Sequence, residues 1–197
     1  MPTHARPQRH TCLTLPVWGG VIRRHDAIAR ALATIIHDVT GAMVHLEKRT
    51  AELQRILHGR MQEGQMDLIV TNLNGRTVYI DVTIVSPVIV SPFHLAQAAN
   101  KPGYAALRAE FGKRQRYPIP NLIPFAIEIG GRPGPAARTF IRDLFREDGA
   151  ARDQSIADAW STLSTALHSA TAHQLNKTAK PPAHPHHLQP PTATASF

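Results

Sequence analysis

Residues 66–86 read Met66-Asp-Leu-Ile-Val-Thr-Asn-Leu-Asn-Gly-Arg-Thr-Val-Tyr-Ile-Asp-Val-Thr-Ile-Val-Ser86, and the other predicted elements are placed relative to them. It contains two apolar runs, Leu68 to Thr71 and Thr77 to Val85, which are joined by Asn74-Gly75. An Asn-Gly pair tolerates the positive φ angles of a tight turn between antiparallel strands. The stretch therefore predicts a β-hairpin.

Each of these two runs carries one acidic residue where a strand should be apolar. Asp67 opens the first run, and Asp81 lies in the middle of the second, between Ile80 and Val82. An ionised carboxylate buried in a sheet is costly unless a cation or hydrogen-bond donors compensate it. Mg²⁺ takes oxygen ligands and is usually held by one or two carboxylates, with waters and substrate phosphates. We therefore predict a divalent metal shared by the two acids.

The alternative for Asp67 is an ordinary role as a turn or capping residue, which is the common reason for an acid beside a strand. This alternative does not suit Asp81, because no turn signal lies near it. Strand alternation places Asp81 on one face with Tyr79 and Thr83, opposite the face that carries Ile80 and Val82.

The length and charge of the chain restrict what it can be. Its 197 residues are enough for one domain with tails. It has 22 Lys and Arg against 14 Asp and Glu, a formal net charge of +8, and its pI is about 10.4. This balance favours polyanionic partners, nucleic acid before an anionic membrane surface.

The single cysteine, Cys12, excludes an intramolecular disulfide and fits a reducing compartment. No apolar run approaches the length of a membrane span, and the first residues lack the apolar core of a signal peptide. We therefore expect a soluble intracellular protein without membrane contact, located in the nucleus if the source is a eukaryote.

The first helix is expected over residues 21–39, where apolar residues recur at spacings of three and four. Arg23, Arg24 and His25 lie at its start, where positive charge opposes the helix dipole. Two interpretations remain open for these three residues: contacts with phosphate groups, or a solvated basic turn.

Two further strands are expected to carry acids, Glu47 in residues 42–48 and Glu128 in residues 121–129. Residues 49–65 are polar and are interpreted as a loop with a short helix. Residues 93–112 favour helix but are interrupted by Pro102-Gly103, so a new helix is expected to start at Pro102, with Lys101 just ahead of it.

Two C-terminal helices are predicted from apolar residues at helical spacing, which we interpret as faces that pack on the core. The residues are Ala137, Phe140, Ile141 and Leu144 in one helix, and Ile156, Trp160, Leu163 and Leu167 in the other. Residues 177–197 have too few apolar side chains to fold and are predicted to be disordered.

Several short motifs occur in an order that resembles a known family of nucleases. They are Arg24-His25-Asp26, Val44-His-Leu-Glu47, Met66-Asp67-Leu-Ile-Val70, Val78-Tyr-Ile-Asp81-Val-Thr-Ile-Val-Ser-Pro87, Lys101-Pro-Gly-Tyr104 and Ile123-Pro-Phe-Ala-Ile-Glu128. The chain resembles the restriction-like PD-(D/E)xK endonuclease domain of the reverse-transcriptase polyproteins of site-specific non-LTR retrotransposons. The resemblance covers roughly residues 10–147 and implies a fragment or degraded copy of such a polyprotein.

The resemblance implies an α/β (α+β) fold with a restriction-endonuclease-like core, ordered helix-strand-strand-strand-helix-strand. Asp67 and Asp81 match the two acids of the motif, whereas Thr83 stands where its lysine is usual. Lys101, near Tyr104, is the best match for a lysine that has moved to the following helix. Pro102-Gly103 interrupts that helix.

The resemblance also implies a zinc-knuckle-like segment before the first helix, of which His10 and Cys12 look like the last ligands. Together with His4 they form an incomplete set, because a structural zinc site needs four ligands. A basic leader without zinc is the alternative. We accordingly divide the chain into a leader (1–20), a nuclease core (21–147), a helical extension (148–176) and a tail (177–197).

The implied activity is hydrolysis of phosphodiester bonds in DNA with Mg²⁺ or Mn²⁺ and no small-molecule cofactor. Asp67, Asp81 and the Val82 carbonyl would hold the metal, and Lys101 would orient the attacking water. Glu47 or Glu128 would extend the acidic cluster. Two other functions remain open: a nucleic-acid-binding remnant of the same fold that does not cleave, and a helical oligomerisation or scaffold protein.

Overall fold

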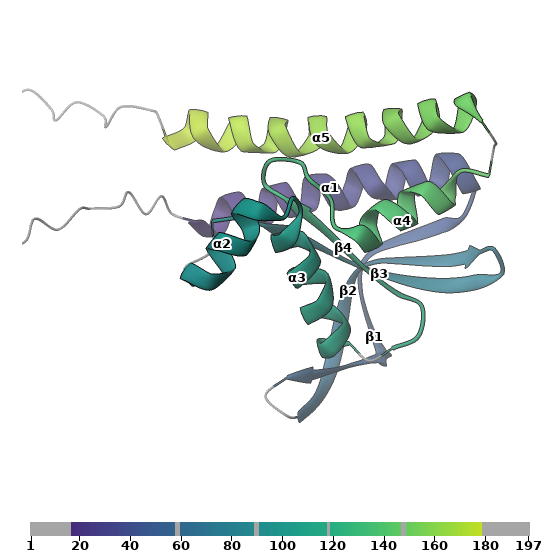
Figure 1. Cartoon of the computed structure of the whole chain (residues 1–197). Helices are drawn as coiled ribbons and strands as arrows, with labels where there is room; N and C mark the ends of the chain where they lie inside the picture. Colours follow the sequence, from purple (N-terminus) through teal and green to yellow (C-terminus); the bar gives the residue numbers. More distant parts are fainter. Residues whose placement is uncertain (1–16, 58–59, 89–90, 118, 147–148, 179–197) are drawn as a thin grey trace, which may run out of the picture.

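The computed structural model describes residues 17–57, 60–88, 91–117, 119–146 and 149–178, and their side chains except at 17–20, 48–65 and 177–178. The elements and their bounds follow in chain order (Figure 1): α1 (Val17–Thr40), β1 (Met43–Leu57), β2 (Arg60–Leu73), β3 (Arg76–Val85), α2 (Pro92–Asn100), α3 (Tyr104–Arg116), β4 (Leu122–Glu128), α4 (Pro135–Leu144) and α5 (Ala150–Thr178).

The four strands form one mixed sheet in the order β1-β2-β3-β4. Strands β1, β2 and β3 pair antiparallel, and β4 pairs parallel to β3. The predicted hairpin is confirmed, because β2 and β3 are joined by Asn74-Gly75, at which φ is +53° and +76°. A parallel pair needs a long crossover connection, and α2 and α3 supply it. The α/β class is therefore confirmed.

Helices cover both faces of the sheet. One face packs against α1, α4 and α5, and the buried residues of this main core include Leu32, Ile36, Ile80 and Phe125. Helix α5 lies along α1 on the outside of this layer (Figure 1). The opposite face meets α3, where a small second cluster gathers around Met66 and Tyr117.

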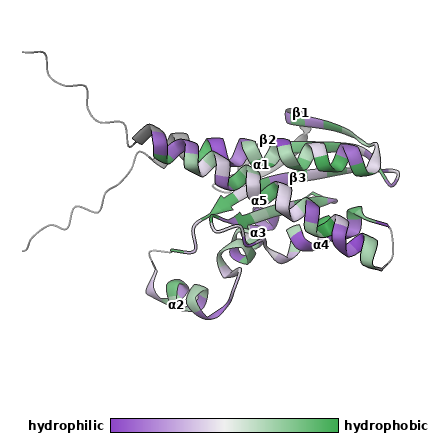
Figure 2. Ribbon diagram, turned by 90° about the horizontal axis from the view of Figure 1, so that it is seen from above, coloured by the Kyte–Doolittle hydropathy of each residue, from purple (hydrophilic) through white to green (hydrophobic). Residues whose placement is uncertain are grey.

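The apolar residues that predict the two C-terminal helices face the core as expected. All four predicted residues of α4 are buried, from Ala137 to Leu144, and so are Leu163 and Leu167 in α5. Helix α2 differs from these, because none of its residues is buried. Figure 2 shows α2 standing away from the sheet.

The interpretation of residues 49–65 as a loop with a short helix is wrong. Strand β1 extends to Leu57, β2 begins at Arg60, and the two pair over this region from Arg49 with Gln65 to Leu57 with Arg60. Backbone hydrogen bonds between the two strands stabilise such a hairpin arm whatever its side chains are. The polar composition therefore gave no strand signal.

The start expected for the helix after Lys101 is also wrong. Helix α3 begins at Tyr104 and not at Pro102. Its N-cap, Gly103, has a φ of +80°, a left-handed conformation that glycine adopts without strain. Pro102 thus lies in the turn between α2 and α3.

Among the described residues, no helix combines the length and apolar character that a membrane span requires.

A buried acid joins α3 to the start of α4. The Glu110 carboxylate accepts hydrogen bonds from the backbone amides of Ala136 (3.0 Å) and Ala137 (3.1 Å). These amides have no partner inside the helix, and the helix dipole favours a negative charge there. Burial raises the pKa of Glu110, and the two amides oppose that rise. A Cβ atom on Gly134 would lie only 2.5 Å from Cδ of Glu110, so any other residue at this position would displace the Glu110 carboxylate from its two amide partners.

We expect Gly134→Ala to lower the free energy of unfolding by about 1–3 kcal/mol, because the added methyl group overlaps the Glu110 carboxylate. The matched control is Gly112→Ala, where an added Cβ meets nothing within 4 Å. Alanine favours a helix interior, so this control should be about 1 kcal/mol more stable than the natural protein. Urea denaturation measures both. Equal effects of the two substitutions would contradict the close contact.

Candidate active site

The register of β2 and β3 brings Asp67 and Asp81 together. Leu68 pairs with Ile80 in this antiparallel pair. The residue before Leu68 is Asp67 and the residue after Ile80 is Asp81, so the two acids lie opposite each other. The ladder between β2 and β3 ends at this point. Oδ2 of Asp67 accepts the backbone amide of Val82 at 2.6 Å. The Asp67 carboxylate thus takes the place of a strand partner where the two strands part.

Asp81 is the more buried of the two acids, with 4% of its surface exposed. Its Oδ1 accepts a hydrogen bond from Nζ of Lys113 on α3 at 2.6 Å. Its Oδ2 is buried and has no hydrogen-bond partner among the described residues. Burial raises the pKa of Asp81 to about 6, because the Lys113 ammonium only partly offsets the burial and the nearby Asp67 carboxylate raises the pKa further. The two acids are therefore electrostatically coupled.

His25 on α1 compensates Asp67. Its Nε2 lies 3.1 Å from Oδ2 of Asp67, and its Nδ1 lies 3.1 Å from Oδ1 of Asp26. The hydrogen bond to Asp67 and the two negative charges raise the pKa of His25 to about 9, although burial opposes this. At neutral pH the ring is therefore a cation that donates a hydrogen bond to each carboxylate.

The lysine beside the acids is Lys113 and not the predicted Lys101. Lys101 is exposed and lies at the C-cap of α2. The sequence places Lys113 on a helical face but does not show which way that face turns. Glu110, Lys113 and Tyr117 follow one another at spacings of three and four, which places them on one face of a helix. That face turns toward the sheet, because Glu110 and Tyr117 are buried.

The two additional acids predicted for the site lie elsewhere. Glu47 is exposed on β1, where its φ is +49°. Glu128 is buried at the end of β4, opposite Val85. Its Oε1 accepts the backbone amide of Ala105 at 3.1 Å, which caps the start of α3. Roughly 13 Å of strand, four residues, separate Val85 from Asp81.

The structure places the predicted nucleic-acid-binding residues in the N-terminal half of α1, which begins at Val17, so they lie inside the helix and not at its start. Arg23 is exposed, whereas the Arg24 guanidinium donates a hydrogen bond to Oε1 of Gln174 on α5 at 2.9 Å. His25 points to the acids, as described above. His10 and Cys12, the proposed remnant of a zinc site, lie outside the described residues.

Comparison with known proteins adds no assignment to this site. No protein-family model matches the chain, and no curated protein matches it. Function is therefore inferred from the acid pair itself. Within the described part of the chain, no group of three or more His, Cys, Asp or Glu residues is arranged to hold a metal ion. A metal at this site would depend on the two carboxylates.

We expect His25 to make stability depend on pH. Its folded pKa of about 9 lies above its ordinary value of 6.5, so its contribution is complete below pH 6.5 and is lost as the pH rises through 9. The full contribution is at most about 3 kcal/mol, and solvent screening lowers it. Urea denaturation over this range, with chelator present, should show a decline in the natural protein that His25→Gln removes.

The control for this experiment is His168→Gln, which removes an exposed histidine whose ring contacts Ser164. This variant should retain the decline. If His25→Gln and the natural protein follow the same curve, the ion pair between His25 and Asp67 does not stabilise the protein.

Proposed function

We propose that this protein is a metal-dependent endonuclease that hydrolyses phosphodiester bonds in DNA, with a restriction-endonuclease-like core. The observation that carries this proposal is the convergence of Asp67 and Asp81 on adjacent strands, with the ammonium group of Lys113 beside them. Two acids and a lysine are the chemical groups that the resemblance to PD-(D/E)xK nucleases implies. The order of the elements agrees with that core: a helix, three antiparallel strands, a helical crossover and a parallel strand.

The side chains at this site suit Mg²⁺ or Mn²⁺. Oδ2 of Asp81 is a buried oxygen without a hydrogen-bond partner among the described residues, and a buried acceptor of this kind is costly unless something binds it. The Asp67 carboxylate lies beside it. Asp67 and Asp81 would hold the ion, which when bound polarises the phosphoryl oxygen and lowers the pKa of a water.

The residues of the chain have separate roles in this mechanism. Lys113 keeps Asp81 ionised at neutral pH by opposing the effect of burial, and we assign to it the role predicted for Lys101. Its ammonium group also lies where it can stabilise the charge that develops on the phosphate. His25 fixes Asp67 from the other side. Because both its ring nitrogens donate to carboxylates, it acts as a positioning residue.

DNA is the proposed substrate because the protein carries a net charge of +8. Contacts with phosphate groups supply most of the affinity of such proteins and carry no sequence information. Arg23 is exposed two residues from His25, so it is the arginine of α1 that we propose as a phosphate contact. Arg24 contacts α5 instead.

A second function, binding of nucleic acid without cleavage, is favoured by one observation. Lys113 and His25 already compensate both carboxylates within the protein. A metal ion would have to share these carboxylates with two protein cations. If the ion does not bind because of this competition, the same fold and net charge would serve to bind nucleic acid without cleaving it.

Asp81→Asn tests the proposed activity. The purified natural protein should nick supercoiled plasmid in Mg²⁺ or Mn²⁺, and the substitution should abolish nicking because it removes a charged ligand. The matched control is Asp158→Asn, which changes an exposed acid on α5 and should nick like the natural protein. If the natural protein shifts the mobility of the plasmid without nicking it, binding without cleavage is the function.

Lys113→Met and Lys101→Met separate the two candidate lysines. We expect the substitution at Lys113 to slow nicking by about 10²-fold or more and the substitution at Lys101 to leave it unchanged. Loss of Lys113 also removes the cation that lowers the pKa of Asp81, so the remaining activity should require a higher pH. An effect confined to Lys101→Met would assign the role to Lys101 and reject the geometry described above.

A further inference from the structure

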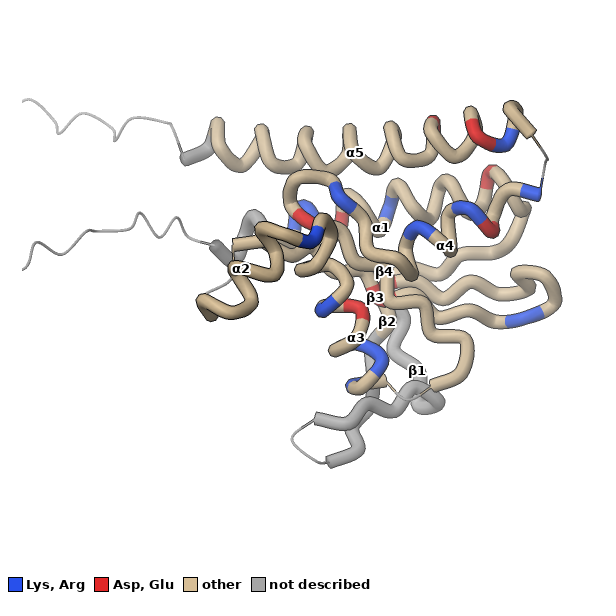
Figure 3. The backbone as a smooth tube through the Cα atoms, viewed as in Figure 1, with Lys and Arg blue, Asp and Glu red and all other residues tan. Residues whose placement is uncertain are grey.

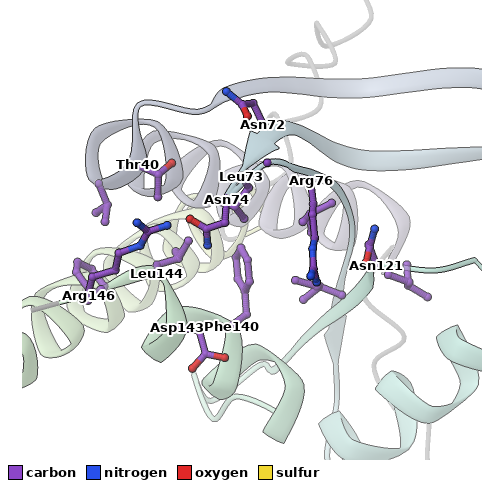
Figure 4. Close-up of a pocket in the computed structure, with 16 residues that line it drawn as sticks. Thr40, Asn72, Leu73, Asn74, Arg76, Asn121, Phe140, Asp143, Leu144 and Arg146 are labelled. Carbon is purple, nitrogen blue, oxygen red and sulfur yellow. The ribbon is translucent and has the colours of Figure 1, made fainter.

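A large hollow lies far from the acid pair, at the other end of the sheet. Asn74, in the turn beside it, follows Asp67 by seven residues, which is roughly 23 Å of strand. The hollow has a volume of about 930 Å³ between the β2–β3 turn and the C-terminal ends of α1 and α4. In Figure 4, Arg76 and Arg146 lie on either side of it, with Asn74 between them.

A second hollow, of about 470 Å³, lies between α3 and α4 and is lined by Leu107, Phe111 and Arg114. Both hollows are lined by Ile123, Phe140 and Asp143. Because they share these residues the two hollows are neighbours, and we call them together the α3–α4 groove.

The α3–α4 groove carries an excess of positive charge. Three exposed arginines line it, Arg76, Arg114 and Arg146, and among the described residues none of them forms a salt bridge. The two acids of the lining are already engaged. Glu110 accepts two backbone amides of α4, and Asp143 pairs with Arg142 at 3.3 Å. The groove therefore suits an anionic ligand.

The groove also exposes an apolar strip. Phe111 is 64% exposed and Leu107, one turn before it on α3, is 48% exposed. Figure 3 shows that α3 also carries several basic residues, and Arg114 lies on the same side as Phe111. An exposed aromatic ring beside guanidinium groups is the arrangement on which single-stranded nucleic acids stack their bases.

Three asparagines at the rim add hydrogen-bonding groups. Asn72, Asn74 and Asn121 line the larger hollow, and each has a positive φ, of 62°, 53° and 58°. Each side-chain amide can both donate and accept hydrogen bonds. Such groups match the Watson–Crick edges of unpaired bases, which are already paired in a duplex.

We propose that the α3–α4 groove binds single-stranded nucleic acid, with phosphates on Arg76 and Arg114 and an unpaired base on Phe111. This site is separate from the acid pair and does not depend on cleavage there. DNA and RNA single strands share the chemistry that the groove recognises.

The test is fluorescence anisotropy of labelled oligothymidylate and oligouridylate of about 16 nucleotides, beside a blunt duplex of the same length, with chelator present. The natural protein should bind single strands more tightly than the duplex, and the tighter of the two homopolymers identifies the natural source. Phe111→Ala should weaken this binding by about 5- to 100-fold. Phe93→Ala, which removes an equally exposed ring outside the groove, should not.

Salt dependence provides a readout that misfolding would not imitate. Arg114→Ala should reduce the slope of log K against log salt for single strands by about 0.7, the loss of one phosphate contact. Arg108→Ala, on the same helix but outside the groove, should leave the slope unchanged.

Equal binding by Phe111→Ala and Phe93→Ala would overturn the proposal. The proposal would also be overturned if the natural protein were a dimer that Phe111→Ala dissociates. A second copy of the protein would then cover the apolar strip of the groove. If the protein does not nick plasmid but still binds single strands, the proposed nuclease activity fails and the proposal for the α3–α4 groove stands.

Discussion

The mutual repulsion and burial of two carboxylates set the constraint on which the structure depends. Asp67 and Asp81 lie at one level of β2 and β3, with 18% and 6% of their side-chain surfaces exposed. Three groups compensate these carboxylates: the backbone amide of Val82, the imidazolium of His25 from α1, and the ammonium of Lys113 from α3. The two cations come from helices on opposite faces of the sheet, α1 and α3. The acid pair therefore links both helical layers to β2 and β3.

Helix α3 shows how one element serves two surfaces. Its inner side carries Glu110, which caps α4, and Lys113, which reaches Asp81. Its outer side carries Phe111 and Arg114, which line the α3–α4 groove. A helix turns by about 100° per residue, so neighbouring residues point in different directions and one short segment can supply both surfaces. The proposed nuclease site and the proposed binding groove are thus separate in space and joined by a rigid element.

The sequence allowed the prediction of those parts that have a local signature. The Asn74-Gly75 turn, the apolar stripes of α4 and α5, and the two acids within apolar strands were all read from neighbouring residues. Lys113 was not, because only the position of Tyr117 and Glu110 against the sheet shows which side of α3 faces Asp81. The polar hairpin arm of β1 and β2 was missed for a related reason. Its strands are stabilised by pairing between backbones, which leaves no apolar alternation in the sequence.

We propose that Asp67 and Asp81 together hold a divalent metal. Anomalous diffraction from crystals grown with Mn²⁺ tests it most directly, since manganese scatters anomalously and replaces Mg²⁺ at oxygen sites. We expect a peak in contact with Oδ2 of Asp81 and the Asp67 carboxylate, and no such peak in crystals of Asp81→Asn. A natural protein saturated with Mn²⁺ that shows no peak at the acid pair, with Lys113 and His25 still in place, would contradict it.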